Sequence, residues 1–414
     1  MSTVPLHFKP RGAPGWADVG SDAFFESFAS SIGGTLEAES LPPACYTDER
    51  FFGFEKRALF HREWLCVGRE DWAAKPGDYF TATHSGEPVI IARNRDGVLH
   101  AMSAVCQHRG MQVAEGSGNA RAFVCPYHHW TYSLDGDLVN APAMEQTCAF
   151  DRGEHGLPRL RMELWCGFVF VNFDPDALPL APRLAAVDEV VAHYAMAELT
   201  GERPGPATVY PWNWKVMFEN NNDGYHANRL HQGPLHDIVP SALCSFPELP
   251  PDTAGYYRLN QSTVRDASFN VTLKALFPVF PALTDEERDR VVFVNLPPSL
   301  SMVVMTDMIL YLILDARGAA SHALTMGTLV RPEALADPLY GQRMKANEEA
   351  VREIVGQDLH VDLMVQAGLS SIHAPRGRYS WQEGAQRQFN LWLVDRYWRQ
   401  RERETSTSAR EPGV

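Results

Sequence analysis

Short apolar and aromatic runs separated by turn residues dominate the chain between residues 79 and 139. The runs at 88–92, 122–125 and 129–133 are rich in β-branched and aromatic residues, a composition typical of strands. Asn-, Asp- and Gly-containing turns follow them. This pattern predicts a small antiparallel β domain, which we expect to continue through another strand at 164–172.

Beyond residue 175 the pattern mixes helices with longer strands. The expected elements are helices at 184–199, 214–230 and 338–365, and strands at 291–295, 301–314 and 322–330. No crossover helices separate these strands, so their sheet should be antiparallel. The predicted fold class is α+β.

A length of 414 residues is enough for two domains, each with its own core. The first forty residues are rich in Gly, Pro, Ser and Ala. We therefore expect an N-terminal arm at 1–43 that packs on the larger domain, a small β domain at 44–174 and a larger mixed domain at 175–414.

Composition and charge exclude some classes of protein. With 37 basic and 51 acidic residues, the net charge is -14, which disfavours binding to a nucleic-acid backbone. No apolar run approaches the length of a membrane span, and the first ten residues lack the pattern of an export signal. We expect a cytoplasmic protein that binds neither nucleic acid nor membrane.

The cysteines point to metal chemistry. The chain has seven cysteines, an odd and scattered set that favours thiols and metal ligands over a disulfide framework. Cys106 and His108 form one mixed clip, and Cys125 and His128 form another sixteen residues later. Two thiolates and two imidazoles can hold a [2Fe–2S] cluster with the cysteines on one iron and the histidines on the other.

Zinc is the competing metal for two Cys and two His. Its common motifs pair Cys with Cys and His with His, whereas both clips here are mixed. Isolated Cys or His residues are usually structural, but four at this spacing favour the Rieske type of cluster.

A second group of candidate ligands lies near the end of the predicted helix 214–230. His226 and His231 are five residues apart, so on a regular helix their imidazoles would point about 140° apart around the axis. Both can bind one metal ion only if the helix unwinds or bulges there. Asp223, three residues before His226, is placed to orient its imidazole. Alone, such a pair could equally be a solvated helix face.

Non-haem Fe(II) oxygenase sites use two histidines and one carboxylate, and leave positions open for O2 and substrate. The carboxylate must come from elsewhere in the chain. Asp358 and Asp362 lie one turn apart on one face of the predicted helix 338–365, and either could be the third ligand.

These motifs together resemble those of the α subunits of Rieske non-haem iron ring-hydroxylating oxygenases. Cys-x-His and Cys-Pro-Tyr-His-x-Trp are followed, about a hundred residues later, by Asn-Trp-Lys, Glu-Asn and Asp-x2-His-x4-His, and the likeness runs from about Tyr46 to Phe389. The resemblance implies cluster ligands Cys106, His108, Cys125 and His128, iron ligands His226 and His231, and a bridging acid, Asp223. The family's third ligand often lies eight residues before Gln-x-Gly; here Gln366-Ala-Gly368 implies Asp358, with Asp362 in reserve.

The resemblance also implies an architecture and partners. We expect a β-sandwich Rieske domain beside a catalytic domain whose antiparallel sheet is flanked by helices. Head-to-tail homotrimers would pair one subunit's cluster with the next subunit's iron. An NAD(P)H-dependent reductase, sometimes with a ferredoxin, would supply electrons for O2 activation. The product would be a hydroxylated, cis-dihydroxylated or demethylated small organic compound, which we expect to be aromatic.

The substrate pocket is the least specified part of the prediction. Apolar segments near 276–280 and 302–310 suggest lining residues, and arginines after a His-Ala-Pro turn suggest an anchor for a carboxylate. The candidates are Phe277, Phe280, Met302, Met308, Arg376 and Arg378. Two other classes of protein stay open: a Rieske electron-transfer protein, which needs only the first group of ligands, and a zinc-stabilised binding protein.

Overall fold

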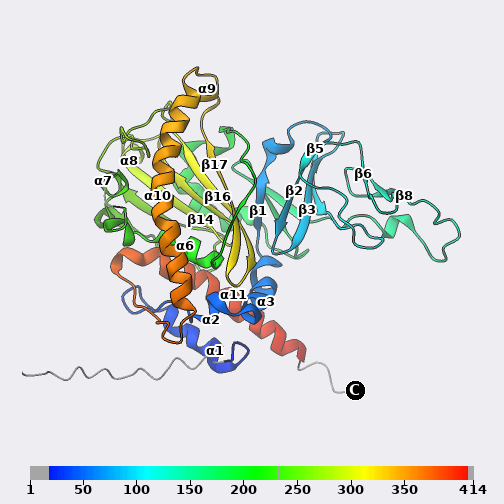
Figure 1. Cartoon of the computed structure of the whole chain (residues 1–414), viewed down its shortest axis with the longest axis horizontal. Helices are drawn as coiled ribbons and strands as arrows, with labels where there is room; N and C mark the ends of the chain where they lie inside the picture. The colour runs from blue at the N-terminus through cyan, green and yellow to red at the C-terminus, as the bar shows by residue number, and fades with distance from the viewer. Residues whose placement is uncertain (1–17, 232–233, 409–414) are drawn as a thin grey trace, which may run out of the picture.

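The computed structural model describes residues 18–231 and 234–408 and shows a small β part beside a larger mixed part (Figure 1). Three antiparallel sheets build the small part. One has the order β4-β3-β2-β5, another β6-β7-β8 and the third β1-β10-β9. Their strands are β1 Leu65–Arg69, β2 Asp78–His84, β3 Glu87–Arg93, β4 Leu99–Ser103, β5 Ser117–Asn119, β6 Phe123–Val124, β7 Thr131–Tyr132, β8 Leu138–Asn140, β9 Arg161–Trp165 and β10 Phe168–Asn172.

The larger part contains a seven-stranded sheet with the order β11-β17-β16-β15-β14-β13-β12, in which every neighbouring pair is antiparallel. Its strands are β11 Thr208–Tyr210, β12 Cys244–Ser245, β13 Tyr256–Gln261, β14 Arg290–Leu296, β15 Leu300–Val304, β16 Ile309–Gly318 and β17 Ser321–Leu329. The α+β class and the antiparallel sheet are thus as predicted.

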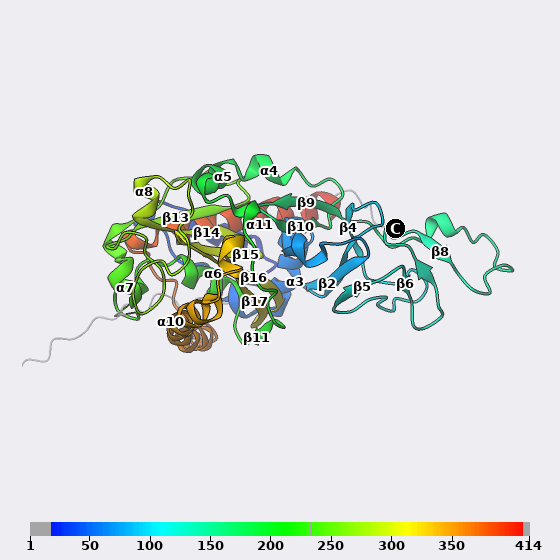
Figure 2. The same ribbon diagram turned by 90° about the horizontal axis from the view of Figure 1, so that it is seen from above.

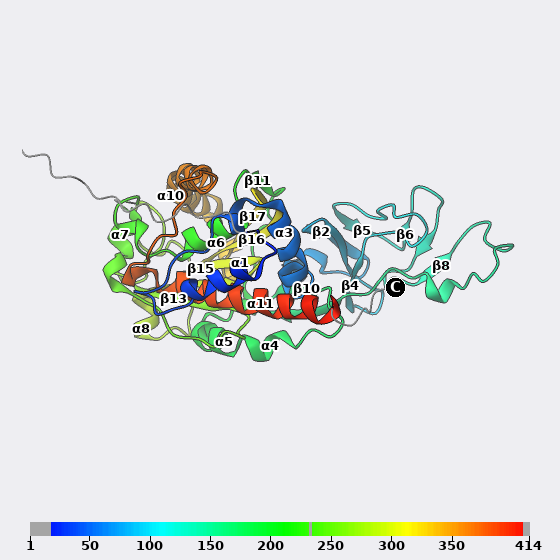
Figure 3. The same cartoon turned by 90° about the horizontal axis from the view of Figure 1, so that it is seen from below.

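Helices cover both faces of this sheet. The helices α6 Trp214–Asn222 and α10 Tyr340–Leu369 pack on one face, and α5 Ala185–Val191 packs on the other (Figures 2 and 3). Helix α11 Gly384–Ser408 runs past the ends of the strands and contacts α6 and β13 (Figure 1). Leu312 and Leu314 of β16 therefore point to the first face, while Tyr311 and Ile313 point to the second. Because both faces are buried, the central strands are apolar at nearly every position.

One predicted strand is wrong. Residues 301–314, expected as a single strand, form β15 and β16, joined by a turn in which Met305 N donates to Met308 O. The polar turn residue Asp307 is fully buried, and its carboxylate accepts hydrogen bonds from the backbone of Leu276 and Phe277. The acidic side chain of this turn is therefore buried, and the turn lacks the solvent-exposed polar residues that usually mark a turn in a sequence.

The described part of the N-terminal segment contacts the larger part, while residues 1–17 of the predicted arm lie outside the described residues. Phe24 and Phe28 contact Phe51, and Phe28 and Phe51 both contact Tyr397 of α11. The next helices, α2 Ala44–Thr47 and α3 Glu49–Glu55, belong to the same core, which includes residues of α10 and α11. We therefore propose that the β domain starts near β1 rather than at residue 44.

Among the described residues, no helix combines the length and the apolar character needed to cross a membrane.

Candidate functional site

Helix α6 ends where the sequence analysis expected a distortion. The Asn213 side chain caps its first turn by accepting from Lys215 N at 2.9 Å. The helix stops at Asn222, because Asp223 adopts an extended backbone with φ of -75° and ψ of 109°. A short 3₁₀ turn at 226–228 follows. The predicted helix to residue 230 is therefore eight residues shorter, and this break lets His226 and His231 turn toward each other.

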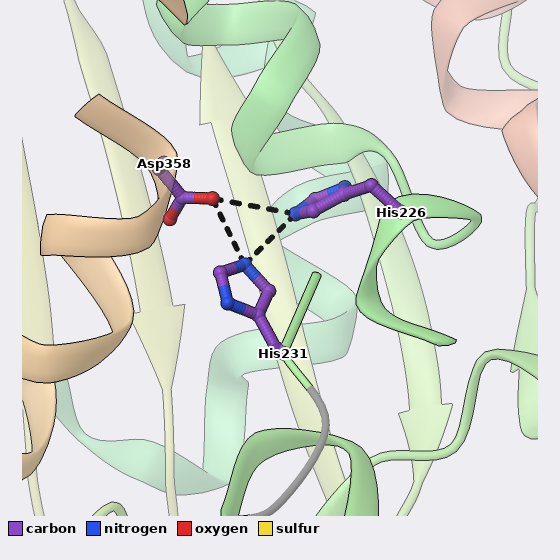
Figure 4. A group of neighbouring side chains, drawn as sticks. All are labelled: His226, His231 and Asp358. Atoms are coloured by element: carbon purple, nitrogen blue, oxygen red, sulfur yellow. Dashed lines mark hydrogen bonds and ion pairs between the residues drawn. The ribbon is translucent and has the colours of Figure 1, made fainter. Parts of the chain in front are cut away.

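His226, His231 and Asp358 converge from two parts of the chain (Figure 4). The two Nε2 atoms lie 3.1 Å apart. Asp358 Oδ1, from α10, lies 2.9 Å from His231 Nε2 and 3.6 Å from His226 Nε2. These ligand atoms all lie within 4.8 Å of one another. The structure thus brings together the three residues predicted to bind mononuclear iron.

The outward-facing nitrogen of each ring faces a polar group, and of the two only that of His231 makes a hydrogen bond among the described residues. His231 Nδ1 donates to Gln357 Oε1 at 2.7 Å, and His226 Nδ1 lies 3.2 Å from Asp223 Oδ2. With protons on Nδ1, both Nε2 atoms carry lone pairs and face the Asp358 carboxylate, so three electron donors converge on one point. This donor set fits Fe(II) with two histidines and one carboxylate. Asp223 lies beside the His226 ring, and its role in orienting that ring stays a prediction.

Electrostatic attraction between the two histidines and the Asp358 carboxylate holds these three residues together. Burial alone would lower the pKa of His231, but the hydrogen bond to Asp358 and the charge of that carboxylate raise it above the usual value. Asn220 Nδ2 donates to Asp358 Oδ1 at 3.2 Å and fixes the carboxylate from α6.

Neither Gln357 nor Asn220 was expected at the site. Gln357 precedes Asp358 directly and Asn220 lies three residues before Asp223, but amides carry no distinctive spacing signal.

Asp362 lies outside this group. It is only 2% exposed, and its Oδ2 atom has no hydrogen-bond partner among the described residues. Burial and the neighbouring charge of Asp358 raise its pKa to about 8. The geometry therefore favours Asp358 over Asp362 as the third ligand, although the assignment stays a prediction.

The two Cys/His clips come together at the far end of the small part. Cys106 and Cys125 are buried, whereas His108 and His128 are exposed, with ring centroids 4.6 Å apart. The His108 ring stacks on Trp130, with centroids 4.9 Å apart and an interplanar angle of 11°. Buried thiolates with exposed imidazoles suit an asymmetric cluster whose histidine side reaches the surface.

Tyr132 is a further residue of this site. Its hydroxyl lies 3.2 Å from Cys106 Sγ and accepts from Gln107 N at 3.0 Å. A hydrogen bond to a ligand sulfur is one of the factors that set a cluster's potential. Tyr132 follows the second clip closely, but the sequence alone did not show that it reaches the first.

A cavity of about 270 Å³ adjoins the His226, His231 and Asp358 group. Its apolar wall includes Phe269, Phe293, Val303, Leu310 and Val351, and Tyr210 and Trp212 add aromatic surface. A mostly apolar cavity with a few polar groups beside a metal site is the usual form of a small-molecule pocket.

The predicted pocket residues do not line this cavity, but Met308 lines an adjoining cavity that shares Tyr210, Leu310 and Val351 with it. None of Phe277, Phe280, Met302, Met308 and Arg376 lines this cavity. Met302 and Phe280 belong to the core on the opposite face of the sheet, whereas Val303 points into the cavity. The sequence of these apolar strands does not show which residues point to the cavity, because a shift of one residue exchanges the two faces of the sheet.

The predicted arginine anchor is also structural. Arg376 Nε donates to Ser40 O at 3.0 Å, and its Nη atoms donate to Ser27 O and Ser31 Oγ. Arg378 donates to Glu37 O. Both arginines hold the N-terminal segment against the chain that follows α10.

Comparison with known proteins places these sites in a family. The family described as ring hydroxylating alpha subunit (catalytic domain) matches residues 183–399, which is more than half of the chain. The Rieske [2Fe-2S] domain matches residues 63–158. The chain belongs to the Rieske oxygenase α subunits. Members of this family are oxidoreductases that use O2, and the two matches imply a [2Fe–2S] cluster and a mononuclear iron.

Relatives of this Rieske oxygenase include two kinds of enzyme. The carnitine monooxygenase oxygenase subunit of Escherichia coli (strain K12) is 36% identical over 200 residues, covering 48% of this chain and 53% of the relative. The benzene 1,2-dioxygenase subunit alpha of Pseudomonas putida is 34% identical over 229 residues, covering 54% and 51%. The chain spans about half the length of the curated relatives it matches.

Solved structures extend the likeness to nearly the whole fold. A quaternary ammonium Rieske monooxygenase that oxidises carnitine in gut microbiota superposes with a TM-score of 0.72 at 25% identity, covering 87% of this chain and 95% of the other. Naphthalene 1,2-dioxygenase from Rhodococcus sp. gives 0.76 at 18% identity, covering 91% and 99%. The latter shows the shared fold alone. The predictions of fold class, family and cofactors are confirmed.

Proposed function

We propose that this protein is the oxygen-activating subunit of a multicomponent enzyme that hydroxylates, dihydroxylates or demethylates a small organic substrate. The observation that carries the proposal is the convergence of His226, His231 and Asp358 beside an apolar cavity. When bound, the cluster and the mononuclear iron would supply electron transfer and O2 activation. A pure electron-transfer protein would need neither the triad nor the cavity.

The residues of this chain would bind the metal, orient the imidazole ligands and exclude water from the site. His226, His231 and Asp358 would hold the metal beside the cavity in which a substrate would bind. Gln357 accepts from His231 Nδ1, and Asp223 lies beside His226 Nδ1, so both would help to keep the Nε2 atoms directed at the metal. The apolar cavity wall would exclude bulk water from the reacting atoms.

The placement of the clips supports assembly into head-to-tail trimers. In all three views the β6–β8 end, which bears the Cys125 and His128 clip, lies at the opposite end of the molecule from α7 Pro234–Ile238, with α6 and α10 in the main body (Figures 1, 2 and 3). We propose that the cluster serves the iron of a neighbouring subunit, and that Asp223 stands at that junction. A separate NAD(P)H-dependent reductase, with or without a ferredoxin, would supply the electrons.

The cavity supports two substrate classes, aromatic compounds and quaternary ammonium compounds. The aromatic faces of Tyr210, Trp212, Phe269 and Phe293 line it. Such faces pack against an apolar ring and also attract a quaternary ammonium ion by cation–π interaction. The relatives divide in the same way, between benzene and carnitine.

Oxygen consumption coupled to product formation tests the proposal. The purified protein, loaded with iron and supplied with NADH and a surrogate reductase, should take up O2 with aromatic or quaternary ammonium compounds and release an oxygenated product. The Asp358→Ala variant should retain the reducible cluster spectrum but form no product. Product formation by that variant at the wild-type rate, or a colourless zinc-containing protein, would contradict the proposal.

A further inference from the structure

Arg258 of β13 is a buried cation without a counter-ion. Its side chain is 4% exposed and lines the cavity beside the metal-binding triad. Arg69 and Arg396 are the other two arginines that are buried among the described residues, and each has a carboxylate partner: Asp71 at 3.5 Å and Glu63 at 3.0 Å. No carboxylate of the described chain lies within the 4.0 Å ion-pair distance of Arg258. A buried charge in this state is costly unless a partner arrives.

The hydrogen bonds of Arg258 leave Nη2 of its guanidinium without a partner among the described residues. Nη1 donates to Asn260 Oδ1 at 3.0 Å, while Nε is fully buried and also lacks a partner there. The guanidinium stacks on Phe293, with its central carbon 3.7 Å from the ring centroid. Stacking and the Asn260 bond fix the orientation of the group, so Nη2, which is neither bonded nor fully buried, is held ready for an acceptor.

Nearby groups do not neutralise this cation. Asp223 and Cys244 are the acidic groups that act on Arg258 electrostatically. The Asp223 carboxylate is already engaged, because it accepts from Tyr225 N and pairs with His226. Burial raises the pKa of the Cys244 thiol, so it is neutral near pH 7. Burial also lowers the pKa of Arg258 to about 10, which still leaves it charged at that pH.

We propose that Arg258 binds a carboxylate of the substrate through Nη2, so that the enzyme acts on small carboxylate-bearing compounds. A hydrogen bond between a guanidinium and a carboxylate is about twice as strong as one between neutral groups. Arg258 lines the same cavity as His226, His231 and Asp358. A carboxylate held at Arg258 would therefore place the rest of the substrate in the cavity beside the metal-binding triad. This inference rests on the proposed function.

Equilibrium binding to matched ligand pairs tests the inference without turnover. Calorimetry on the cluster-containing protein would compare glycine betaine with choline, and benzoate with benzyl alcohol. In each pair the scaffold is the same and only one member carries a carboxylate. We expect the carboxylate member to bind about tenfold or more tightly in at least one pair. Arg258→Gln should abolish that preference, and Arg258→Lys, which keeps the charge, should retain part of it.

Arg69→Gln is the matched control, because Arg69 is also buried and stacked on an aromatic ring, Phe168, but does not line the cavity. It should lower the thermal midpoint while leaving the ligand preference unchanged. An absence of carboxylate preference in both wild-type pairs, or an unchanged preference in Arg258→Gln, overturns the inference. O2 uptake with a substrate that lacks a carboxylate would then leave the proposed function standing.

Discussion

At the scale of single residues, Asp358 and Asp362 provide a direct comparison of two acids one helical turn apart. Asp358 Oδ1 lies within 3.6 Å of both Nε2 atoms, whereas Asp362 belongs to no such group. We expect Asp358→Ala to lose the mononuclear iron and retain the cluster, since the ligands of the two sites lie on separate sheets and helices. Asp362→Asn should retain both. Metal analysis together with the cluster absorbance measures this, and iron lost only from the Asp362 variant would reverse the assignment.

His322 should make stability depend on pH. It is fully buried, its Nδ1 donates to Trp212 O at 2.9 Å, and burial lowers its pKa from 6.5 to about 4. The unfolded chain therefore binds a proton more readily, so stability is present above pH 6.5 and is lost as the pH falls from there toward 4. The full effect is about 3 kcal/mol.

Urea denaturation at several pH values checks this expectation. His322→Asn keeps a donor for the Trp212 carbonyl but cannot titrate, so its stability should fall less than that of the wild type between pH 6.5 and 4. Carboxylates titrate in the same range, and the comparison with wild type removes their contribution. Parallel pH profiles for the two proteins would disprove the role of His322.

At the scale of helices and strands, a buried ion pair sets where α6 begins. Lys215 Nζ lies 2.8 Å from Glu55 Oε1 of α3, and both side chains are fully buried. Trp214 and Tyr397 donate to the same carboxylate, which links α6, α3 and α11. The Lys of the Asn-Trp-Lys motif thus anchors the helix whose other end presents Asp223.

Removing one charge of this ion pair should lower the free energy of unfolding more than removing both charges. Lys215→Met leaves Glu55 buried without its cation, and we expect a loss of about 3–5 kcal/mol in unfolding free energy. The double variant Lys215→Met, Glu55→Gln should recover part of that loss, because no uncompensated charge remains. Urea denaturation followed by tryptophan fluorescence measures both. Equal losses in the single and double variants would argue against a charge effect.

The sequence predicted features that depend on local spacing and missed those that depend on which face a strand presents. The mixed Cys/His clips, the His226 and His231 pair and the distortion of their helix follow from short-range geometry. Short-range geometry does not show which residues of β15 face the cavity, because Met302 and Val303 are equally apolar and both are buried. The cavity arginine, Arg258, was missed for a similar reason. Arg258 lies in β13, and the residue that pairs with it in the sheet, Phe293 of β14, is thirty-five residues away in the sequence.

At the scale of the whole molecule, the proposed trimer predicts that two inactive variants can restore each other. His128→Ala should lack a working cluster, and Asp358→Ala should lack the mononuclear iron. If electrons cross between subunits, co-expressed variants should form mixed trimers in which one of the three cluster-to-iron junctions works, so these trimers should have about a third of wild-type activity. Purification by two different tags, followed by product measurement, tests this. Inactive mixed trimers would show that each subunit depends on its own cluster.

The aromatic cluster that joins Phe24, Phe28 and Phe51 to Tyr397 has a consequence for how the chain is made. These phenylalanines leave the ribosome near the start of synthesis, but the ring they pack against is added only after almost four hundred residues. Domains generally fold as units in the order of their synthesis. The β domain can therefore fold while translation continues, whereas Phe24, Phe28 and Phe51, which contact one another, lack the Tyr397 ring until α11 emerges. During this interval the nascent larger domain offers its apolar surface to chaperones, and a ribosome that stalls before residue 397 leaves a product that cannot close its core.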